Sequence, residues 1–211
     1  MITNAQILPM ESYKRIQHFN YFKDMAYPYV GITTDVDITN FLTYIKERKH
    51  PFFLSFLWCV AKAANMVPEL RQRIYNDGII EYCNCDTSHT VAKEDGTYCY
   101  CSLNCNQPFD SFIKYAIEKQ EQAKQYGDIT ENKEDALSLF FISTLPWISY
   151  SSLIQPVPMP ADSNPRITWG KYYKKDGKIV LPVSILCHHA LIDGKHIADF
   201  FSHLDNALQL E

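Results

Sequence analysis

The sequence predicts an α+β fold, a two-layer arrangement in which helices cover one face of a mixed β-sheet. Strand-like and helix-like segments follow one another without the regular alternation that produces a purely parallel sheet. The chain has 211 residues, of which 46% are apolar and 14% aromatic, so it can bury a substantial core. No internal repeat, low-complexity tract or linker interrupts it, and residues 1–211 are therefore predicted to form a single domain.

Five segments carry the apolar spacing of helices. The segment 51–67 is apolar on nearly all sides, which predicts a buried helix with Pro51 as its first residue. Ser12 is a candidate N-cap for the first helix, and Thr39 or Asp37 lies near the start of the second. The five predicted helices are residues 12–24, 38–49, 51–67, 109–127, which ends at Gly127, and 193–208.

The strand predictions rest on alternating or β-branched runs bounded by turn residues. Asp77-Gly78, Asp95-Gly96 and Asp176-Gly177 are turn signals between such runs. The predicted strands lie within residues 29–39, 76–85, 88–103, 135–146 and 166–189, the last of these being a hairpin.

Charge and hydropathy exclude two classes of partner. The formal net charge is -4, and Lys and Arg form no dense tract, so neither nucleic acid nor an anionic membrane is expected. No apolar run approaches the ~20 residues that span a bilayer. The first residues, MITNAQILPMESYKR, lack a basic region followed by a long apolar one, so we expect a cytoplasmic protein without a signal peptide.

Five of the seven cysteines cluster, at Cys83, Cys85, Cys99, Cys101 and Cys105. One hypothesis is a zinc site. The other is a pair of adjacent strands with cysteines on one face, because residues i and i+2 of a strand point the same way. The C-x-C spacing differs from the C-x2-C spacing of structural zinc sites, so the strand interpretation is favoured and no metal is expected.

The segment CHHALIDGKHIADF, residues 187–200, combines two adjacent histidines with Asp193-Gly194. An apolar run from Ile179 to Leu186 leads into it, so one imidazole is expected to be half-buried at the end of a central strand. A positioned neutral imidazole is a good general base near neutral pH. The alternative is a structural turn in which backbone carbonyls satisfy both rings, and the spacing alone favours neither.

The stretch HHALIDGKH resembles the HHxxxDG signature of chloramphenicol acetyltransferases, which dihydrolipoyl acyltransferase cores and related CoA-dependent acyltransferases share. YKRIQHFNYF is similar to the W-x-R-x-x-HF helix at the N-terminus of that family. VDIT, FFLSFLWCVAKAAN, PELR, ISTLPWISY and ITWGKYY also have counterparts in the same order, so the resemblance covers roughly residues 11–209. A motif shared by chance would not bring its neighbours along, and this favours the catalytic interpretation.

The resemblance implies an O-acetyltransferase that moves the acetyl group of acetyl-CoA directly to a hydroxyl of chloramphenicol or a similar small molecule, and thus a role in antibiotic resistance. It assigns His189 as the general base, a task in which a positioned imidazole contributes ~10²–10⁴-fold. It assigns Ser143 to the oxyanion of the tetrahedral intermediate, with Thr168 assisting through water. Asp193 is implied to form a structural ion pair with Arg15 that holds the loop of His189.

The resemblance also implies how the substrates bind. Lys171 would lie near a CoA phosphate and Tyr172 beside the pantetheine, although ordinary exposure at a strand edge explains both equally well. Acetyl-CoA is a co-substrate, and no bound cofactor is implied. The family is a homotrimer, so His189 would meet an acceptor pocket built largely by the neighbouring chain. The residues matching acceptor-pocket positions are Thr90, Val157, Tyr21 and Phe22.

The acceptor pocket departs from the family pattern. Pro28 and Val30 stand where members that acetylate chloramphenicol place a cysteine and an aromatic residue. Arg166 replaces an aliphatic residue and Gln155 a leucine, so the pocket is partly polar and a different hydroxyl acceptor is an alternative. A non-catalytic protein that binds acyl-CoA or a small molecule is a second alternative, although such a protein would have no reason to keep the base, the oxyanion donor and the ion pair together.

Overall fold

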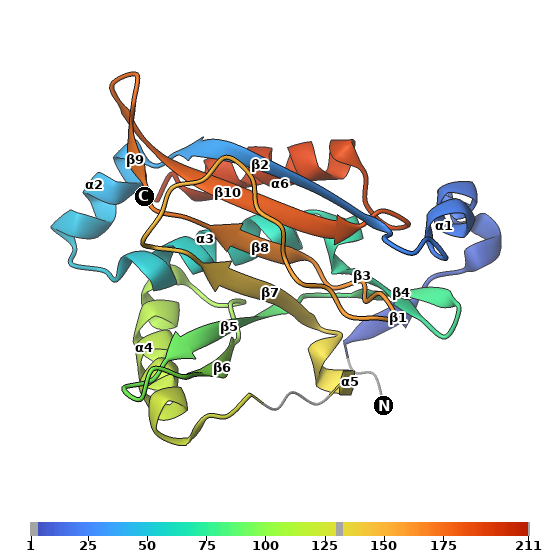
Figure 1. The fold of residues 1–211 in the computed structure, drawn as a ribbon, viewed down its shortest axis with the longest axis horizontal. Coiled ribbons are helices and arrows are strands. Elements are labelled where there is room, and N and C mark those ends of the chain that lie inside the picture. Colours follow the sequence, from blue (N-terminus) through green and yellow to red (C-terminus); the bar gives the residue numbers. More distant parts are fainter. Residues whose placement is uncertain (1–3, 130–132, 211) are drawn as a thin grey trace.

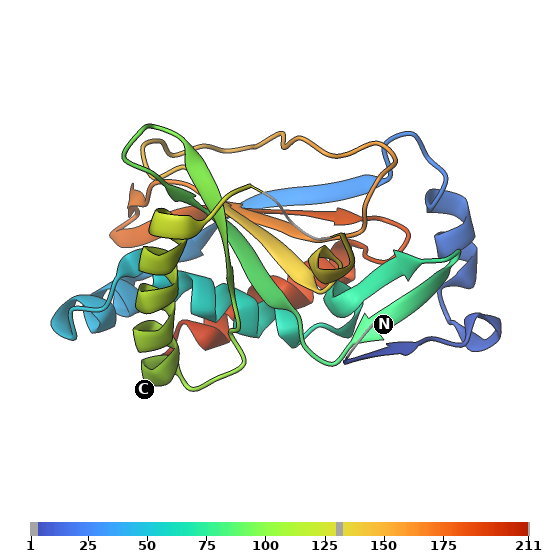
Figure 2. The ribbon, with the colours of Figure 1, turned by 90° about the horizontal axis from the view of Figure 1, so that it is seen from below.

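The computed structural model describes residues 4–129 and 133–210. They form a mixed β-sheet with helices packed against one of its faces, so the predicted α+β class is confirmed (Figures 1 and 2). The connection of residues 145–165 crosses the opposite face, which we call the open face of the sheet (Figure 2). The sheet therefore presents one side to the apolar core and the other to this connection.

The main sheet has seven strands and mixes parallel with antiparallel pairs. Its order is β2 (Tyr29–Asp37), β10 (Lys178–His188), β8 (Arg166–Trp169), β7 (Leu139–Thr144), β5 (Asp86–Ala92) and β6 (Tyr98–Leu103), with β9 (Tyr173–Lys175) beside β10. β10 pairs antiparallel with β2 and β8, whereas β7 pairs in parallel with β8 and β5. The turn between β9 and β10 lies at Asp176 and Gly177, as predicted.

A second sheet has three strands in the order β1 (Ala5–Ile7), β4 (Gly78–Tyr82) and β3 (Gln72–Tyr75). The predicted turn at Asp77 is confirmed, and the positive φ angles of Asn76 and Asp77, 47° and 62°, fit a tight hairpin. Arg73 of β3 is fully buried and donates to the carbonyl oxygens of Leu70 and Leu139. This guanidinium joins the small sheet to the start of β7.

The helices agree with the predictions except at their ends. The first helix begins at Ile16, because Ser12 lies in an earlier 3-10 turn and its hydroxyl donates to the Pro9 carbonyl instead of capping the helix. Pro51 is the N-cap of the third helix and not its first residue. The helices are α1 (Ile16–Phe22), α2 (Thr39–Glu47), α3 (Phe52–Asn65), α4 (Phe109–Tyr126), the unpredicted α5 (Lys133–Ala136) and α6 (Gly194–Ala207), with 3-10 turns at Met10–Ser12 and Pro68–Arg71.

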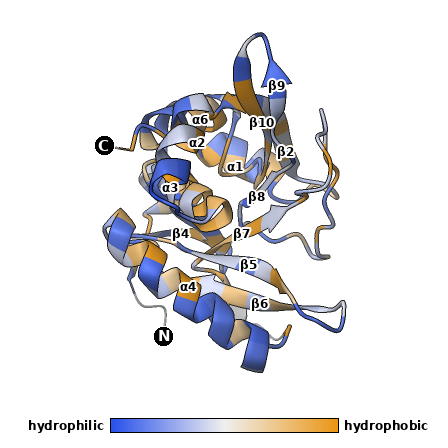
Figure 3. Ribbon diagram, turned by 90° about the vertical axis from the view of Figure 1, so that its left-hand side faces the viewer, coloured by the Kyte–Doolittle hydropathy of each residue, from blue (hydrophilic) through white to orange (hydrophobic). Residues whose placement is uncertain are grey.

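The core lies between α3 and the sheet, as the apolar composition of this helix predicts. Phe56 of α3 meets Trp169 of β8 edge to face, with ring centroids 5.0 Å apart. α6 and α4 pack on either side of α3, and the surface of α4 is largely hydrophilic where it turns outward (Figure 3). None of the described helices is long and apolar enough to cross a bilayer.

The five clustered cysteines are divided between one strand and two loops, since Cys105 follows the end of β6. Cys99 and Cys101 are buried on one face of β6, in agreement with the strand interpretation. Burial raises the pKa of the Cys101 thiol to about 11. Cys83 and Cys85 instead lie in the connection between β4 and β5, so the strand prediction is wrong there. Within residues 4–129 and 133–210, no group of three His, Cys, Asp or Glu residues is arranged to hold a metal.

Gly170, just after β8, lies in close contact with the connection that crosses the open face. A Cβ atom there would lie 2.8 Å from the carbonyl oxygen of Ile148 and 2.9 Å from the ring of Tyr150. We predict that Gly170→Ala lowers the free energy of unfolding in urea by about 1–3 kcal/mol, because the loop must shift. Gly78→Ala is the matched control, since its Cβ would be 3.7 Å from the nearest atom. Equal losses in both variants would contradict the prediction.

Candidate active site

The turn between β10 and α6 holds the two histidines. β10 ends at His188, and the N–H of His189 donates to the carbonyl oxygen of Pro28 at 2.7 Å, which ties the turn to the start of β2. Asp193 is the N-cap of α6, and its carboxylate accepts the Lys195 N–H at 3.0 Å. A backbone hydrogen bond therefore fixes one end of this short turn, and a side-chain cap fixes the other.

The His189 ring is half-buried and oriented by a backbone carbonyl. Its Nδ1 lies 2.8 Å from the carbonyl oxygen of Ile192. Because a carbonyl oxygen can only accept, Nδ1 carries a hydrogen, and in the neutral ring Nε2 then keeps its lone pair. The ring packs on Phe22, with centroids 4.0 Å apart, and Nε2 has no hydrogen-bond partner in the described chain. This is the geometry of an imidazole free to take up a proton at Nε2.

His188 is in a different environment. It is buried against Tyr29, with ring centroids 5.8 Å apart, and its Nδ1 accepts the Ala190 N–H at 3.3 Å. Burial lowers the pKa of His188 to about 4, so the ring is neutral at physiological pH. A buried imidazole with this low basicity supports the turn and is a poor base.

Arg15 and Asp193 form an ion pair between the N-terminus of α1 and that of α6. Burial raises the pKa of the Asp193 carboxyl, but the hydrogen bond from Arg15, together with the nearby charges, outweighs burial and leaves the pKa below its usual value. The pair therefore holds the first helix against the turn that carries His189.

Ser143 and Thr168 belong to a row of hydroxyl side chains on the open face of the sheet. Thr33, Ser184, Thr168 and Ser143 stand opposite one another on β2, β10, β8 and β7. Thr33 and Ser184 share a hydrogen bond of 2.7 Å. The Ser143 hydroxyl has no hydrogen-bond partner in the described part of the chain, so it is available to a ligand.

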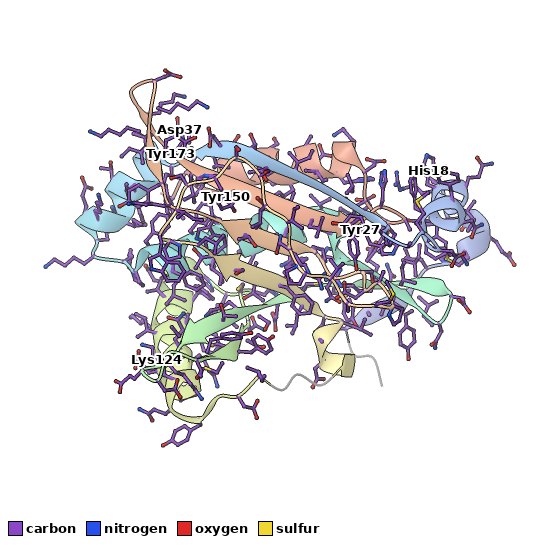
Figure 4. The ribbon with its side chains drawn as sticks, in the orientation of Figure 1. His18, Tyr27, Asp37, Lys124, Tyr150 and Tyr173 are labelled. Carbon is purple, nitrogen blue, oxygen red and sulfur yellow. The ribbon has the colours of Figure 1, made fainter. Side chains whose placement is uncertain are left out.

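Side chains from the crossing connection cover part of this row. The Tyr150 hydroxyl, labelled in Figure 4, donates to the Thr168 carbonyl at 3.0 Å. The Thr168 hydroxyl donates to Gln155 Oε1 at 3.1 Å. Gln155, one of the departures from the family pattern, thus lies directly on Thr168.

Arg166, another departure, is neutralised by its neighbours. Its guanidinium forms two hydrogen bonds of 2.7 and 2.8 Å with Asp162 and lies over the ring of Phe141. Asp162 also accepts from the Tyr29 hydroxyl, and burial together with this carboxylate raises the pKa of Tyr29 to about 12. The protein is polar around Arg166, but the guanidinium charge is paired with the Asp162 carboxylate.

One chain does not bring His189 and Ser143 together. His188 is four residues beyond Ser184, and Ser143 is two strands away at the level of Ser184. With a rise of ~3.3 Å per residue and ~4.8 Å between strands, the Cα atoms of His188 and Ser143 lie roughly 16 Å apart. A base must reach the hydroxyl that attacks a carbonyl carbon, and an oxyanion donor must reach the oxygen of that same carbonyl, so this separation is too large for one chain to supply both groups to one site.

Some of the remaining predicted site residues lie near His189, and the others lie near Ser143 or beyond the end of β8. Tyr21 packs on Phe22, and Phe22 on His189. Thr90 is exposed on β5 beside Ser143, because each follows the paired residues His89 and Ile142. Val157 lies in the crossing connection. Lys171 is exposed just after β8, and next to it the Tyr172 ring lies 5.6 Å from that of Phe52.

The sequence interpretation missed two groups that contact the turn. The Ile192 carbonyl was missed because a backbone acceptor leaves no residue signature. His196 was missed although its signal was present, since it is the third residue of a helix capped by Asp193, the position of the capping box. Its Nδ1 accepts the Asp193 N–H at 3.1 Å, and its Nε2 lies 3.6 Å from Glu69.

We predict that Arg15→Met lowers the free energy of unfolding by about 1–3 kcal/mol at pH 7, less than for a fully buried pair because Asp193 is partly exposed. The folded-state pKa of Asp193 is depressed, so its contribution is present above the unfolded pKa and is lost as pH falls through the folded value. The difference between wild type and Arg15→Met in urea unfolding should therefore shrink below about pH 4. A difference that grows in acid would contradict this.

Known proteins resemble the chain over nearly its whole length. A chloramphenicol acetyltransferase of Klebsiella sp is 28% identical over 206 residues, covering 96% of this chain and 93% of the relative. One from Clostridium perfringens is 32% identical over 205 residues, covering 93% and 95%. A solved chloramphenicol acetyltransferase superposes with a TM-score of 0.89 at 26% identity, over 97% of this chain and 100% of that one.

A more distant structure shares the fold alone. A dihydrolipoamide acetyltransferase of Azotobacter vinelandii has a TM-score of 0.69 at 18% identity, over 91% of this chain and 85% of its own. The family model of chloramphenicol acetyltransferase, in contrast, matches residues 3–205. With the HHxxxDG turn, the hydroxyl row and the two-layer fold all inside that match, the chain belongs to the chloramphenicol acetyltransferase family and is an acyltransferase.

Proposed function

We propose that residues 1–211 act as one domain that transfers the acetyl group of acetyl-CoA to a hydroxyl of chloramphenicol or a similar small molecule. The observation that carries the proposal is the His189 ring, which is held at Nδ1 by the Ile192 carbonyl and free at Nε2. Family membership supplies the reaction class, and the free Nε2 supplies the base that this reaction needs.

In the proposed mechanism, Nε2 of His189 takes the proton of the acceptor hydroxyl while the hydroxyl oxygen bonds to the thioester carbon. The carbonyl electrons move onto oxygen and form a tetrahedral oxyanion. When the carbonyl re-forms, the carbon–sulfur bond breaks, and the proton on His189 passes to the departing CoA sulfur. No acyl-enzyme is needed, because the acetyl group moves directly between the two substrates.

The proposed oxyanion donor is Ser143, with Thr168 assisting through water. The Ser143 hydroxyl is unpartnered in the described chain and projects from the open face, which supports this role. Donors already in place where negative charge develops need no rearrangement during the reaction, and losing one such donor costs ~10²–10³-fold in kcat in other enzymes.

We propose that the active site forms between chains of a homotrimer. The separation of His189 from Ser143 within one chain supports this arrangement. So do large apolar side chains that the crossing connection leaves exposed. Trp147, Ile154 and Met159 are 77%, 94% and 87% exposed, which is typical of a surface covered by a partner. In this trimer, His189 of one chain would face Ser143 and the acceptor pocket of the next.

Lys171 and Tyr172 are proposed to bind CoA. Lys171 is exposed and forms no ion pair in the described chain, which suits a contact with phosphate. Tyr172 is 40% exposed and offers an aromatic surface to the pantetheine. The acetyl-CoA would come from the cytoplasm, where the chain is proposed to act.

Two kinds of acceptor molecule are compatible with the residues near the hydroxyl row. Thr90, Val157, Tyr21 and Phe22 are proposed to line its pocket. The hydrogen bond between Gln155 and Thr168 favours an acceptor more polar than chloramphenicol as the second candidate, because an apolar group placed there would leave the amide unsolvated. Chloramphenicol acetylation would protect a host cell from the antibiotic, whereas another acceptor would give the same chemistry a different role.

We predict that purified protein releases free CoA thiol from acetyl-CoA in the presence of chloramphenicol, and that His189→Ala abolishes the release. Removing the base should lower kcat by at least ~10²-fold. The assay measures thiol with a chromogenic reagent, with and without acceptor. His189-dependent release with another alcohol alone would keep the mechanism and discard chloramphenicol. No stimulated release with any alcohol of a broad panel would leave the non-catalytic binding protein.

We predict that inactive chains complement each other. If His189 and Ser143 of one site come from different chains, each mixed trimer of His189→Ala and Ser143→Ala contains one intact site. Random mixing at equal amounts should then restore about a quarter of the wild-type activity, given cyclic symmetry. The measurement is thiol release after co-expression, compared with each variant alone. Activity no higher than that of the Ser143→Ala protein would place both residues in one chain.

A further inference from the structure

One peptide group at the active turn is held at both ends by imidazole rings. The carbonyl oxygen of Ile192 accepts from His189 Nδ1 at 2.8 Å, and the N–H of Asp193 donates to His196 Nδ1 at 3.1 Å. These two atoms belong to the same peptide unit, which is planar and rigid. The orientation of one ring is therefore linked to the other through a single plane.

The hydrogen bonds fix the hydrogens along this chain of groups. His196 Nδ1 accepts a backbone N–H, so its hydrogen is on Nε2, which faces Glu69 Oε1 at 3.6 Å. These groups therefore form a series of polar contacts that runs from the Glu69 carboxylate through the His196 ring and the Ile192–Asp193 peptide to the His189 ring. The free Nε2 of His189 lies at the end of this series.

We propose that His196, supported by Glu69, is a positioning residue that sets the orientation and the tautomer of His189 through the Ile192–Asp193 peptide. The inference rests on the proposed function, in which His189 Nε2 is the base. Within the described residues, no hydrogen bond or ion pair joins His196 or Glu69 to His189. The residues act on it only by fixing the carbonyl to which His189 Nδ1 donates.

Two physical effects make the orientation of this peptide depend on the acceptor at its N–H. It lies between the last residue of β10 and the first of α6, where neither ladder nor helix bonds hold its plane. An acceptor at its N–H prevents it from rotating and turning the carbonyl away from His189. Hydrogen bonds in series also polarise one another, so a peptide that donates at nitrogen is a better acceptor at oxygen.

The other contacts of His196 define the competing state. Asp193 Oδ1 lies 3.1 Å from His196 Nδ1 and already accepts the Lys195 N–H at 3.0 Å. A doubly protonated His196 would donate to both carboxylates and could no longer accept the Asp193 N–H. In that state the N–H of the peptide would lose its hydrogen-bond acceptor.

The ring nitrogens of the wild-type protein test the proposal without any variant. In the ¹⁵N NMR spectrum of labelled protein at pH 7.5, the two rings should be opposite tautomers. His189 should carry its hydrogen on Nδ1 and His196 on Nε2. A hydrogen on Nδ1 of His196, in either the neutral or the charged ring, would overturn the proposal.

Two substitutions separate positioning from bulk structure. His196→Gln keeps an acceptor for the Asp193 N–H, because Gln at this helix position is an ordinary capping-box residue. His196→Leu fills a similar volume with an apolar side chain that cannot accept the Asp193 N–H. We expect kcat to fall about 5- to 20-fold in His196→Leu with KM for acetyl-CoA unchanged, and to stay within about 3-fold of wild type in His196→Gln. His203→Leu, further along α6, is the matched control and should retain wild-type kcat.

The outcomes distinguish this inference from the proposed function. If His196→Gln and His196→Leu lose kcat equally, or if neither loses it, His196 does not act as an acceptor and the inference fails. If the wild type shows no His189-dependent acetyl transfer, the proposed function fails. The tautomers of His189 and His196 then still test whether the Ile192–Asp193 peptide links the two rings. If His196→Leu does not fold, the wild-type spectrum alone still tests the inference.

Discussion

The pairing of β10 on both of its sides is the constraint on which the rest of the molecule depends. Nine of its residues, Val180 to His188, are in register with β2, and residues 183–186 are in register with β8. Alternate side chains therefore face the helices, where Val183, Ile185 and Cys187 are buried, while Ser184 stands on the open face. The same ladder brings His189 next to the Pro28 carbonyl, so the hydrogen bonds that build the sheet also locate the ring of the proposed base.

This architecture separates the two halves of the proposed chemistry. The proposed base, His189, lies beyond the end of β10, and the hydroxyl row crosses the middle of the open face. The distance between them follows from the strand register and cannot be closed by rotating side chains. The connection that crosses this face buries Thr168 beneath Gln155 and leaves apolar side chains outward. A second copy of the chain would both cover those side chains and bring the missing half of the site. Stability of the assembly and activity would then arise from the same surface.

The sequence predicted most elements because their signals are local. Turn residues at Asp77 and Asp176, the apolar helix that became α3 and the helix stop at Gly127 all act within a few residues. Ser12 failed as a cap because the Pro9 carbonyl competes for its hydroxyl. Cys83 and Cys85 failed as strand residues because the crossover from the small sheet to the main sheet occurs there.

In the candidate site, the residue types were recognisable but their contacts were not. The Arg15 and Asp193 pair spans most of the chain, and the resemblance alone linked those positions before the structure joined them. The Ile192 carbonyl, the bond between Gln155 and Thr168, and the closed pair of Arg166 with Asp162 all depend on where loops return in space. The most direct test of the account is a crystal structure of the protein with CoA and a hydroxyl acceptor bound. We predict that the acceptor oxygen lies about 2.6–3.2 Å from His189 Nε2 and that a partner chain supplies the nearest Ser143 hydroxyl. An acceptor hydroxyl bound away from Nε2, or a site completed by Ser143 of the same chain, would contradict it.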